Sequence, residues 1–327
     1  MPMHQTTAQG GEAFKISFII TYYNIPLDML RQCVESILQL DLQPEEREII
    51  LVDDGSPISP KDIVKQYGTA IRYIKQDNQG PAIARNTGLD AAQGRYIQFV
   101  DADDYLLKRG FEYCMDLIRR NDDLDIVTIA HTQGQSTAKT FSHTPSMSGA
   151  EYMLNYNLCG ADWAYLFRQS TMGELRFTPG IVHEDEEFVP QLLLQAKKVV
   201  RTTGAAYYYR RREGSIVNKE DSDHLRKRLA DFEQVIDNLH LLSLHLSGMP
   251  QQALSRRVHQ LVMDHLYNVI RLTGSMKAVE ETTSRLRQKG LFPLPAFDYT
   301  RKYKWFRRIS SSRIGRRILL LTLHRQP

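Results

Sequence analysis

The chain has 327 residues, of which 42% are hydrophobic and 24% charged, and its formal net charge is +4. This length and composition fit one or two globular domains and exclude a wholly disordered, collagen-like or solenoid chain. Nine basic and no acidic residues lie between Arg301 and Pro327, so the other 300 residues hold 33 basic and all 38 acidic residues. The basic character therefore belongs to the C-terminal end and not to the whole protein.

Three cysteines, Cys33, Cys114 and Cys159, are too few and too far apart for a disulfide framework or a CxxC metal pair. They are typical of small buried hydrophobic residues in a reducing compartment. No apolar run approaches the ~20 residues of a membrane-spanning helix, and Met1–Lys15 lacks the apolar segment of a secretory signal. We therefore expect a cytoplasmic protein with a disordered tail over residues 1–14.

The first half of the chain alternates short apolar runs with segments of helical spacing. The runs are Ile16–Thr21, Glu48–Val52, Ile71–Ile74, Tyr96–Val100 and Asp125–Ile129. Near-continuous apolar runs are typical of strands that are buried on both faces of a parallel sheet. Helical spacing follows Pro26 and recurs in Pro81–Ala92 and Leu107–Asn121. This alternation predicts βαβ units, and hence an α/β fold with a Rossmann-like sheet and helices on both sides.

The second half changes character. The polar segment Gln133–Ala150 predicts a long loop or an extension of the sheet, and Ala205–Arg210 predicts a further strand. Apolar residues then recur at helical spacing over 225–239 and 254–269, which predicts a helical appendage. The expected organisation is an α/β domain over 15–215, the helical appendage over 216–290 and a basic amphipathic tail over 291–327.

Acidic residues follow two of the predicted strands, whereas two common nucleotide-binding signatures are absent. There is no GxxxxGK[ST] loop and no GxGxxG after the first strand, which argues against a P-loop NTPase or an ordinary dinucleotide dehydrogenase. Asp53-Asp54 follows the second strand and Asp101-Ala102-Asp103-Asp104 the fourth. Ligands of open α/β sheets bind beyond the carboxyl ends of the strands, so both clusters are expected to face one crevice with Thr21-Tyr22-Tyr23-Asn24. Asp101 and Asp103 are suited to one Mg²⁺ or Mn²⁺ ion, although turns and helix caps also explain acidic strand ends.

In this order, the pieces resemble the inverting glycosyltransferases of family 2, which have the GT-A fold. The resemblance runs from Ile16 to about Arg210. The matching segments are ISFIITYYN (Ile16–Asn24), ILVDDGS (Ile50–Ser56), NQGPAIARNTGLDAAQGRYIQFVDADD (Asn78–Asp104) and HEDEEF (His183–Phe188). The family often has proline where this chain has Thr21, and it tolerates threonine there. The resemblance implies transfer of a sugar from a nucleotide-sugar, expected to be UDP-linked, to a hydroxyl of a glycan or glycolipid acceptor. It also implies a single displacement that depends on Mn²⁺ or Mg²⁺.

The resemblance further implies roles for individual residues of the donor site. The residues implied for nucleotide-sugar binding are Thr21, Tyr23, Asp53, Asp54, Asn78, Arg85, Asp101 and Ala102. Thr21, Tyr23 and Asp54 would hold the uracil and ribose, because a tyrosine ring stacks on a base and a carboxylate accepts from uracil N3–H. Asn78 and Arg85 would close the diphosphate or sugar end, and Asp101 would contact the ribose or donor sugar. Two alternatives stay open: that Asp53 positions its loop instead, and that Arg85 pairs with the Asp-rich loop instead.

For catalysis, the resemblance implies that Asp185 is the base that deprotonates the acceptor hydroxyl, with Glu184 as its neighbour. An acidic run at a helix N-terminus is the alternative for this segment. Asp103 would be the main metal ligand. His183 would be a third metal ligand or a donor to the diphosphate, unless it is only a satisfied polar residue. Trp163 would line the acceptor site, with core packing as the alternative.

Two other functions and the role of the tail stay open. A transferase to a polyprenyl phosphate would need the base less, and a nucleotide-sugar-binding protein would lack turnover. The segment Arg301–Pro327 mixes its cations with aromatic and aliphatic residues, which is typical of a helix lying on an anionic membrane surface, here the inner face of the cell membrane. A basic helix docked on the acidic core is the alternative. No nucleic-acid motif is present, and no nucleic-acid partner is expected.

Overall fold

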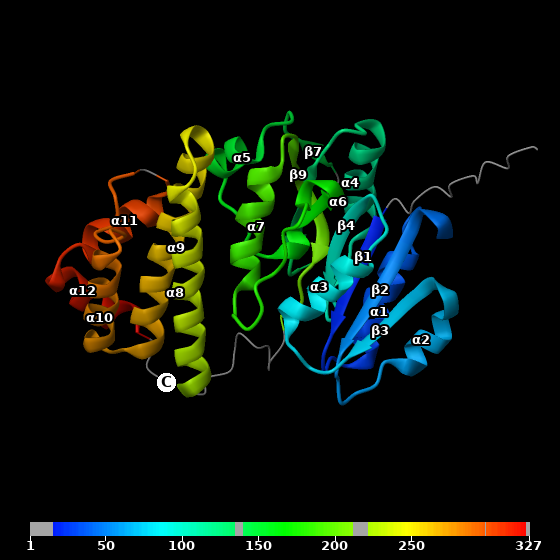
Figure 1. Ribbon diagram of the computed structural model, residues 1–327, viewed down its shortest axis with the longest axis horizontal. Helices are drawn as coiled ribbons and strands as arrows, with labels where there is room; N and C mark the ends of the chain where they lie inside the picture. The colour runs from blue at the N-terminus through cyan, green and yellow to red at the C-terminus, as the bar shows by residue number, and fades with distance from the viewer. Residues whose placement is uncertain (1–15, 135–139, 212–221, 298, 325–327) are drawn as a thin grey trace, which may run out of the picture.

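The computed structural model describes residues 16–134, 140–211, 222–297 and 299–324. In these residues an α/β unit built on one sheet is followed by a group of helices (Figure 1). The predicted tail over 1–14, the part of the predicted loop over 135–139 and the boundary expected at 215–216 lie outside the described residues.

Four parallel strands form the first half of the sheet, in the order β3-β2-β1-β4. They are β1 (Ile16–Tyr22), β2 (Arg47–Asp54), β3 (Ile71–Gln76) and β4 (Tyr96–Asp101), and the connecting helices are α1 (Leu27–Leu38), α2 (Lys61–Tyr67) and α3 (Pro81–Ala91). Short 3₁₀ turns at Pro44–Glu46 and Gly68–Ala70 precede β2 and β3. The first four predicted strands are therefore confirmed. The direction of strand succession reverses between β1 and β4, where open α/β sheets place their ligands.

The second half of the sheet is mixed, so the parallel strand–helix–strand units that the sequence predicted make up only its first half. β8 (Tyr165–Arg168) runs antiparallel to both β4 and β6 (Ile126–Thr132), and β6 pairs in parallel with β9 (Val199–Tyr208). The short strands β5 (Tyr105–Leu106) and β7 (Ser142–His143) pair antiparallel with β9. The predicted strand at Asp125–Ile129 exists, but β8 lies between it and β4. β8 follows a 3₁₀ turn and not a segment of helical spacing, so the alternation that predicted the other strands does not mark it.

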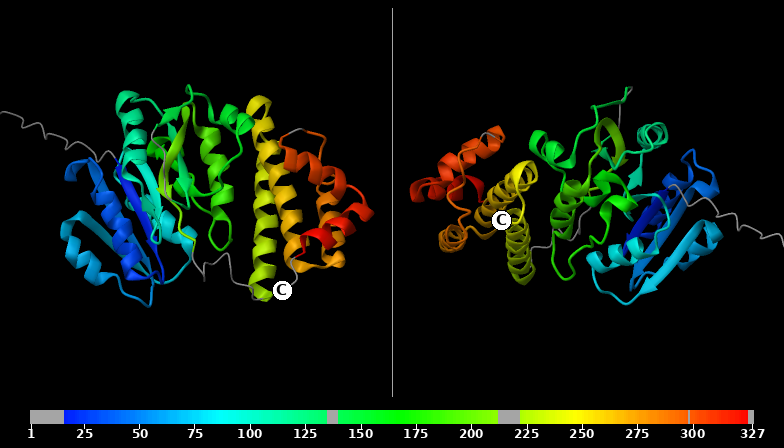
Figure 2. Two further views of the ribbon diagram at one scale, coloured as in Figure 1. Left: turned by 180° about the vertical axis from the view of Figure 1, so that it is seen from behind. Right: turned by 45° about the horizontal axis from the view of Figure 1, so that its top comes forward.

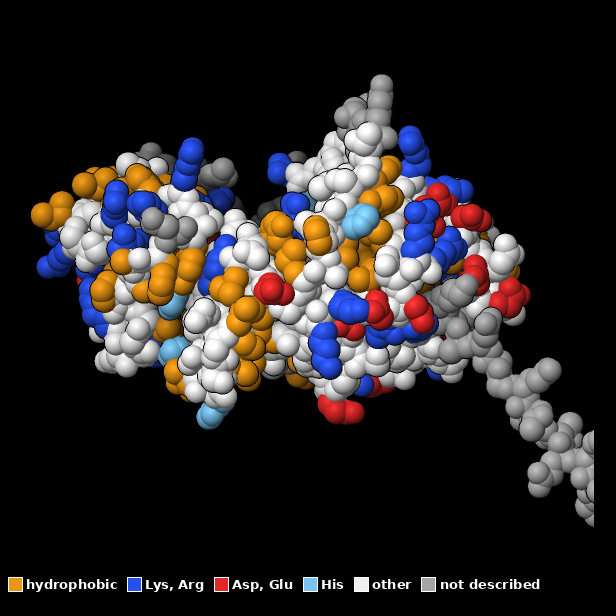
Figure 3. Space-filling model, turned by 90° about the horizontal axis from the view of Figure 1, so that it is seen from above, with side chains coloured by type: hydrophobic (Ala, Val, Ile, Leu, Met, Phe, Trp, Pro, Cys, Tyr) orange, Lys and Arg blue, Asp and Glu red, His pale blue; other side chains and the backbone are white. Residues whose placement is uncertain are grey.

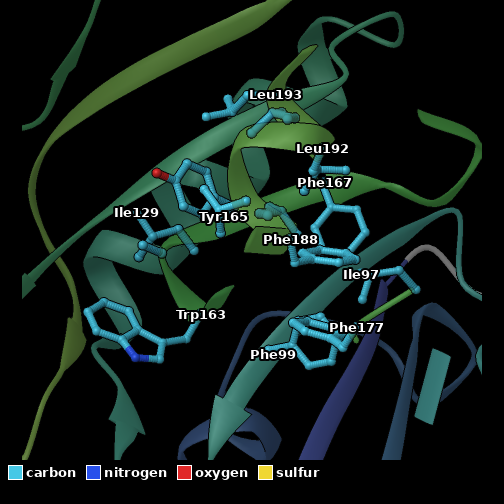
Figure 4. Close-up of a cluster of buried hydrophobic side chains, with 14 of the residues drawn as sticks. Ile97, Phe99, Ile129, Trp163, Tyr165, Phe167, Phe177, Phe188, Leu192 and Leu193 are labelled. Carbon is cyan, nitrogen blue, oxygen red and sulfur yellow. The ribbon is translucent and has the colours of Figure 1, made fainter. Parts of the chain in front are cut away.

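Aromatic packing fixes the helix that begins within the acidic segment HEDEEF (His183–Phe188). The remaining elements of the α/β unit are α4 (Lys108–Arg120), α5 (Gly149–Asn155), a 3₁₀ turn (Asp162–Ala164), α6 (Gln169–Met172) and α7 (Glu184–Gln195). Phe188 of α7 stacks on Phe177 with ring centroids 4.0 Å apart, and Phe177 meets Phe99 of β4 edge-on (Figure 4). Because all three rings are buried, α7 is held against the sheet and its first turn has a defined position.

The helical region lies beside α7, on the side away from β1–β3 (Figures 1 and 2). It comprises α8 (Ser222–Leu244), α9 (Gly248–Thr273), α10 (Met276–Gln288), α11 (Arg301–Ser310) and α12 (Arg313–Leu323). Both α11 and α12 pack on α9, so the basic tail is part of the helical region and not a segment of its own. Within the described residues, no helix is both long enough and apolar enough to cross a membrane.

Candidate active site

The carboxyl ends of β1, β2 and β4 bring three of the predicted segments together. Thr21 of β1 is paired in register with Val52 of β2 on one side and with Asp101 of β4 on the other. Tyr23 follows β1 and is 49% exposed, which leaves its ring accessible to a flat partner. The sequence therefore correctly predicted that the segments after these strands share one edge of the sheet.

Asp53 and Asp54, although adjacent, make different contacts. The carboxylate of Asp53 is buried and accepts hydrogen bonds from the Ser56 amide (2.8 Å) and the Tyr73 hydroxyl (2.7 Å). These contacts fit the alternative in which Asp53 positions its loop. The carboxylate of Asp54 accepts from the amides of Gln79 and Gly80, both at 2.9 Å. Asp54 thus ties the end of β2 to the turn that opens α3.

The loop after β2 also contacts Asn78 directly. The side-chain amide of Asn78 donates to the carbonyl oxygen of Asp54 at 3.0 Å. Gly55 has a φ of +67°, and a Cβ atom there would lie 2.7 Å from the amide nitrogen of Asn78. Glycine is therefore needed both for the backbone conformation and for the close approach of the two loops. The structure thus brings Asp54 and Asn78 into contact, a pairing that the sequence analysis did not predict.

The segment after β4 crowds carboxylates at the switch point of the sheet. A backbone hydrogen bond from Asp104 to Asp101 (3.0 Å) closes a turn in which Ala102 is buried, while Asp101 and Asp103 stay half-buried. Burial, together with the charges of Asp162, Asp104 and Asp103, raises the pKa of Asp101 well above its usual range. Like-charged oxygens in this arrangement favour a cation, so the chemistry of this turn fits a Mg²⁺ or Mn²⁺ ion.

Arg85 of α3 is the hub of an ion-pair network. Its Nη1 lies 2.5 Å from Oε1 of Glu184, its Nε pairs with Asp162, and its Nη2 lies 3.9 Å from Oδ1 of Asp101. Burial lowers the pKa of Arg85, but these carboxylates outweigh it and raise the pKa above its ordinary value. The side chain is only 11% exposed. The predicted alternative, pairing with acidic residues, is thus realised, and it extends to Asp162 and Glu184.

The first turn of α7 presents two carboxylates in different states. Glu184 is buried and paired with Arg85, whereas Asp185 is half-buried and its Oδ1 accepts from the amide of Glu186 at 2.8 Å. Burial, together with the charges of Glu184 and Glu186, raises the pKa of Asp185 well above its usual range. A carboxylate with a raised pKa and partial access is suited to accept a proton.

His183 lies toward the helical region. It precedes α7 with a left-handed φ of 74°, and its ring meets Phe232 of α8 edge-on with centroids 4.9 Å apart. Burial lowers the pKa of His183 to about 4, so the imidazole is neutral at pH 7. In the part of the chain that the structure describes, no group of three or more His, Cys, Asp and Glu side chains could hold a metal ion by itself. The contact with Phe232 favours the alternative in which His183 is a packing residue.

Trp163 lies in the core, 6% exposed (Figure 4). Its ring stacks on Tyr207 of β9 with centroids 4.4 Å apart and planes 11° apart, and His131 of β6 meets it edge-on. Tyr207 therefore covers the aromatic face that was expected to meet an acceptor sugar. The contacts fit the alternative interpretation, core packing.

Residues that the sequence did not single out complete the site. Asp162 holds Arg85 from the 3₁₀ turn before β8, and the Tyr207 hydroxyl accepts from the Asp101 amide at 3.0 Å. The amide of Arg210 donates to the buried carboxylate of Asp104 at 2.7 Å. The two residues of each of these pairs are more than 70 positions apart in the sequence. A local sequence pattern therefore cannot predict that they are in contact.

The helical region contacts the first turn of α7 and the segment just before it. The guanidinium of Arg257, on α9, pairs with Glu186 and is 8% exposed. Asn238 of α8 donates to Oε1 of Glu187 at 2.9 Å. Asp231, also on α8, accepts from the Val182 amide, likewise at 2.9 Å. The helix that carries Asp185 is thus positioned from the sheet side by Phe188 and from the other side by α8 and α9.

Comparisons with known proteins agree with this architecture. The family model described as Glycosyl transferase family 2 matches residues 17–176. The chain is 37% identical over 129 residues to the "Uncharacterized glycosyltransferase EpsJ" of Bacillus subtilis, covering 38% of this chain and 36% of EpsJ. It is 28% identical over 255 residues to "Glycosyltransferase GlyG" of Streptococcus pneumoniae, covering 71% and 83% of the two chains. The chain thus matches only about a third of the length of EpsJ.

Solved structures show the same fold. TarS of S. aureus, residues 1–349, superposes with a TM-score of 0.62 at 19% identity, covering 91% of this chain and 90% of that one. The same TarS fragment in complex with UDP-GlcNAc gives a TM-score of 0.59. The mannosyltransferase PcManGT from Pyrobaculum calidifontis, in complex with GDP-Man and Mn²⁺, gives 0.57 at 12% identity, covering 94% and 87%. At these identities the likeness establishes the GT-A fold alone.

Proposed function

Because the chain belongs to the family 2 glycosyltransferases, we propose that it transfers a sugar from a UDP-sugar to a hydroxyl of a glycan or glycolipid acceptor. The transfer is a single displacement that inverts the anomeric carbon. The observation that carries the proposal is the first turn of α7, where Asp185 keeps partial access and a raised pKa beside a Glu184 that Arg85 neutralises. A binding protein without turnover has no need of such a carboxylate.

The donor nucleotide is proposed to lie beyond β1 and β2. The exposed ring of Tyr23 stacks on the base, with Thr21 beneath it. Asp54 borders the base and ribose, and Asn78, whose side-chain amide donates to the carbonyl oxygen of Asp54, leads from there to the diphosphate or sugar end. Asp101 and Ala102 border the ribose and sugar from the end of β4. A solved neighbour in complex with UDP-GlcNAc supports the choice of a UDP-linked donor.

The divalent ion is proposed to lie at the turn after β4. Asp103, with Asp101 beside it, would hold Mn²⁺ or Mg²⁺, and the diphosphate of the donor would supply further oxygen ligands. When bound, the ion offsets the negative charge on the departing diphosphate. The crowded carboxylates of this turn and the Mn²⁺-containing mannosyltransferase neighbour support this assignment.

Asp185 is the proposed general base. A direct displacement requires one group that takes the proton of the acceptor hydroxyl as the oxygen attacks the anomeric carbon. Arg85 pairs with Glu184 and Asp162 and so holds the first turn of α7 against α3 and the 3₁₀ turn before β8, with Asp101 of β4 3.9 Å away. The nucleophile and the sugar are then held in one geometry, which accounts for a large part of the rate of such reactions.

A thermal-shift screen with UDP-GlcNAc, UDP-glucose, UDP-galactose and GDP-mannose, with and without Mn²⁺, tests the donor class. A ligand at 100 times its Kd stabilises the native state by about 2.7 kcal/mol. A UDP-sugar should raise the melting temperature most, and more so with Mn²⁺. Release of UDP that depends on an added acceptor then tests turnover. Binding without transfer or hydrolysis with any acceptor would contradict the enzyme proposal, and unchanged turnover by Asp185→Asn would favour a polyprenyl-phosphate acceptor.

A further inference from the structure

The last helix of the described chain presents a stripe of exposed aliphatic side chains. Ile314, Ile318 and Leu321 of α12 are 74%, 50% and 84% exposed. The opposite side of the helix is buried through Gly315, Arg316 and Leu319, which pack it on the helical region. The helix is thus docked, and the exposed stripe is not needed for docking.

Two arginines border this stripe. Arg313 and Arg317 are exposed, and no ion pair to another described residue engages either of them. At ~100° per residue, Arg313, Arg317, Leu321, Ile314 and Ile318 fall in this order within an arc of about 140°. We name these five residues the α12 face. Arg316, in contrast, is buried and pairs with Glu280 at 2.9 Å. One arginine of the helix thus holds it in place, while Arg313 and Arg317 are exposed to solvent.

The preceding helix, which contacts α12, repeats the combination. Trp305 of α11 is 52% exposed, and Arg301 and Arg308 lie on the same side of the helix at spacings of four and three. In the view from above, orange hydrophobic and blue basic side chains intermingle over the helical end of the molecule, whereas red acidic side chains lie mostly over the sheet end, mixed there with basic ones (Figure 3). Acidic residues are absent from residues 301–327 altogether.

From this arrangement we propose that the α12 face docks the protein on an anionic lipid surface. A helix whose exposed arc joins aliphatic side chains to arginines buries the former at the headgroup boundary while the latter contact lipid phosphates. Tryptophan prefers the same depth. This inference does not depend on the proposed transferase activity.

Other occupants fit the charges less well. A second copy that docks symmetrically would bring Arg313 and Arg317 against their own equivalents, because such an interface uses the same patch on both subunits. A nucleic acid would pair with the arginines but would leave Ile314, Ile318 and Leu321 without an apolar partner. A lipid surface satisfies both kinds of side chain.

Co-sedimentation of the full chain with vesicles tests the proposal. Vesicles of equal parts phosphatidylcholine and phosphatidylglycerol should bind it at low salt, and added salt should weaken binding. Vesicles of phosphatidylcholine alone should bind it much less. The variant Arg313→Gln/Arg317→Gln should lower the partition coefficient about 25-fold, since each arginine near the surface contributes about a factor of five. The variant Ile314→Ser/Ile318→Ser/Leu321→Ser should abolish binding.

A matched control uses two exposed leucines of α8, Leu241 and Leu244, which are 57% and 60% exposed. Leu241→Ser/Leu244→Ser should bind vesicles like the parent protein. All variants should keep the parent's melting temperature and its thermal shift with the UDP-sugar, which separates this proposal from the donor site. Absence of binding to anionic vesicles at low salt, or equal binding by the triple serine variant, would overturn the proposal. A dimer that the triple serine variant dissociates, without vesicle binding, would overturn it in favour of a second copy.

Discussion

Nη1 of Arg85 on α3 lies 2.5 Å from Oε1 of Glu184, the residue that immediately precedes Asp185 on α7. The same guanidinium also pairs with Asp162 before β8. Two adjacent carboxylates at one helix N-terminus thereby differ in their surroundings. Glu184 is buried and its charge is paired with Arg85, whereas Asp185 is partly exposed to solvent and has a raised pKa. The difference is a property of tertiary contacts, because nothing in the sequence Glu184-Asp185 distinguishes them.

Asp185→Asn is expected to lower kcat by roughly 10²–10⁴, the usual contribution of a general base. The affinity for the UDP-sugar should stay within a few fold, because Asp185 is assigned to the acceptor side. Single-turnover transfer and isothermal titration with the donor measure the two effects separately. Loss of donor binding with unchanged turnover of the bound donor would place Asp185 in the nucleotide site instead.

Glu184→Gln is expected to lower kcat less than Asp185→Asn does. Glutamine keeps the size of the side chain and can still accept from Arg85, so the turn stays in place while the charge is lost. The same single-turnover measurement applies. If Glu184→Gln were the more damaging of the two changes, the two roles would have to be exchanged.

Local patterns in the sequence were sufficient to predict the parallel half of the fold. The runs that became β1 to β4 are apolar and alternate with segments of helical spacing, so both their existence and the meeting of Thr21 with Asp101 could be foreseen. The antiparallel insertion of β8 could not, because β8 follows a 3₁₀ turn and lies outside that alternation. The tail was correctly expected to be helical and amphipathic, but its docking through Arg316 and Glu280 depends on a long-range contact.

The sequence indicated which residues belong to the site, but it indicated less well which of these residues contact one another. Strand-end position correctly predicted that the segments after β1, β2 and β4 meet at one edge of the sheet, as the register of Thr21 with Val52 and Asp101 shows. The sequence left open whether Arg85 meets phosphate or carboxylates, because the answer depends on Asp162, which is 77 positions away. Trp163 illustrates the same limit: its chemistry suits a sugar, but Tyr207 from a distant strand covers its face.

Asp103→Ala is expected to abolish transfer and the Mn²⁺-dependent part of UDP binding, with the fold intact. Loss of one carboxylate at the turn after β4 removes a ligand that a hard cation requires. Thermal shifts with UDP, recorded with and without Mn²⁺, measure the effect. The matched control is Asp62→Ala, an exposed aspartate on α2 that should leave the metal effect unchanged. Normal turnover by Asp103→Ala with the metal chelated would show that the metal site is wrongly assigned.

When kcat/KM is plotted against pH, Glu186→Gln is expected to move the acid limb of the curve to lower pH. The charge of Glu186 is one of the causes that raise the pKa of Asp185, so its removal lowers that pKa and keeps the base ionised in more acidic solution. The initial rate, measured at subsaturating donor from weakly acidic to neutral pH, reports the shift. A limb that stays in place or moves upward would mean that Asp185 is not the group that titrates.

Arg257→Gln is expected to move the same limb in the opposite direction. Arg257 of α9 pairs with Glu186, and without it the charge of Glu186 acts on Asp185 unopposed, which raises the pKa of Asp185. Because the pair is largely buried, removing one partner should also lower the free energy of unfolding by about 3–5 kcal/mol. The double variant Glu186→Gln/Arg257→Gln leaves no unpaired charge, so it should regain much of that stability. Its acid limb should lie close to that of Glu186→Gln. Melting curves and pH profiles of the two single variants and the double variant separate this electrostatic role from mere packing, since a packing defect would lower stability without the opposed shifts in pH.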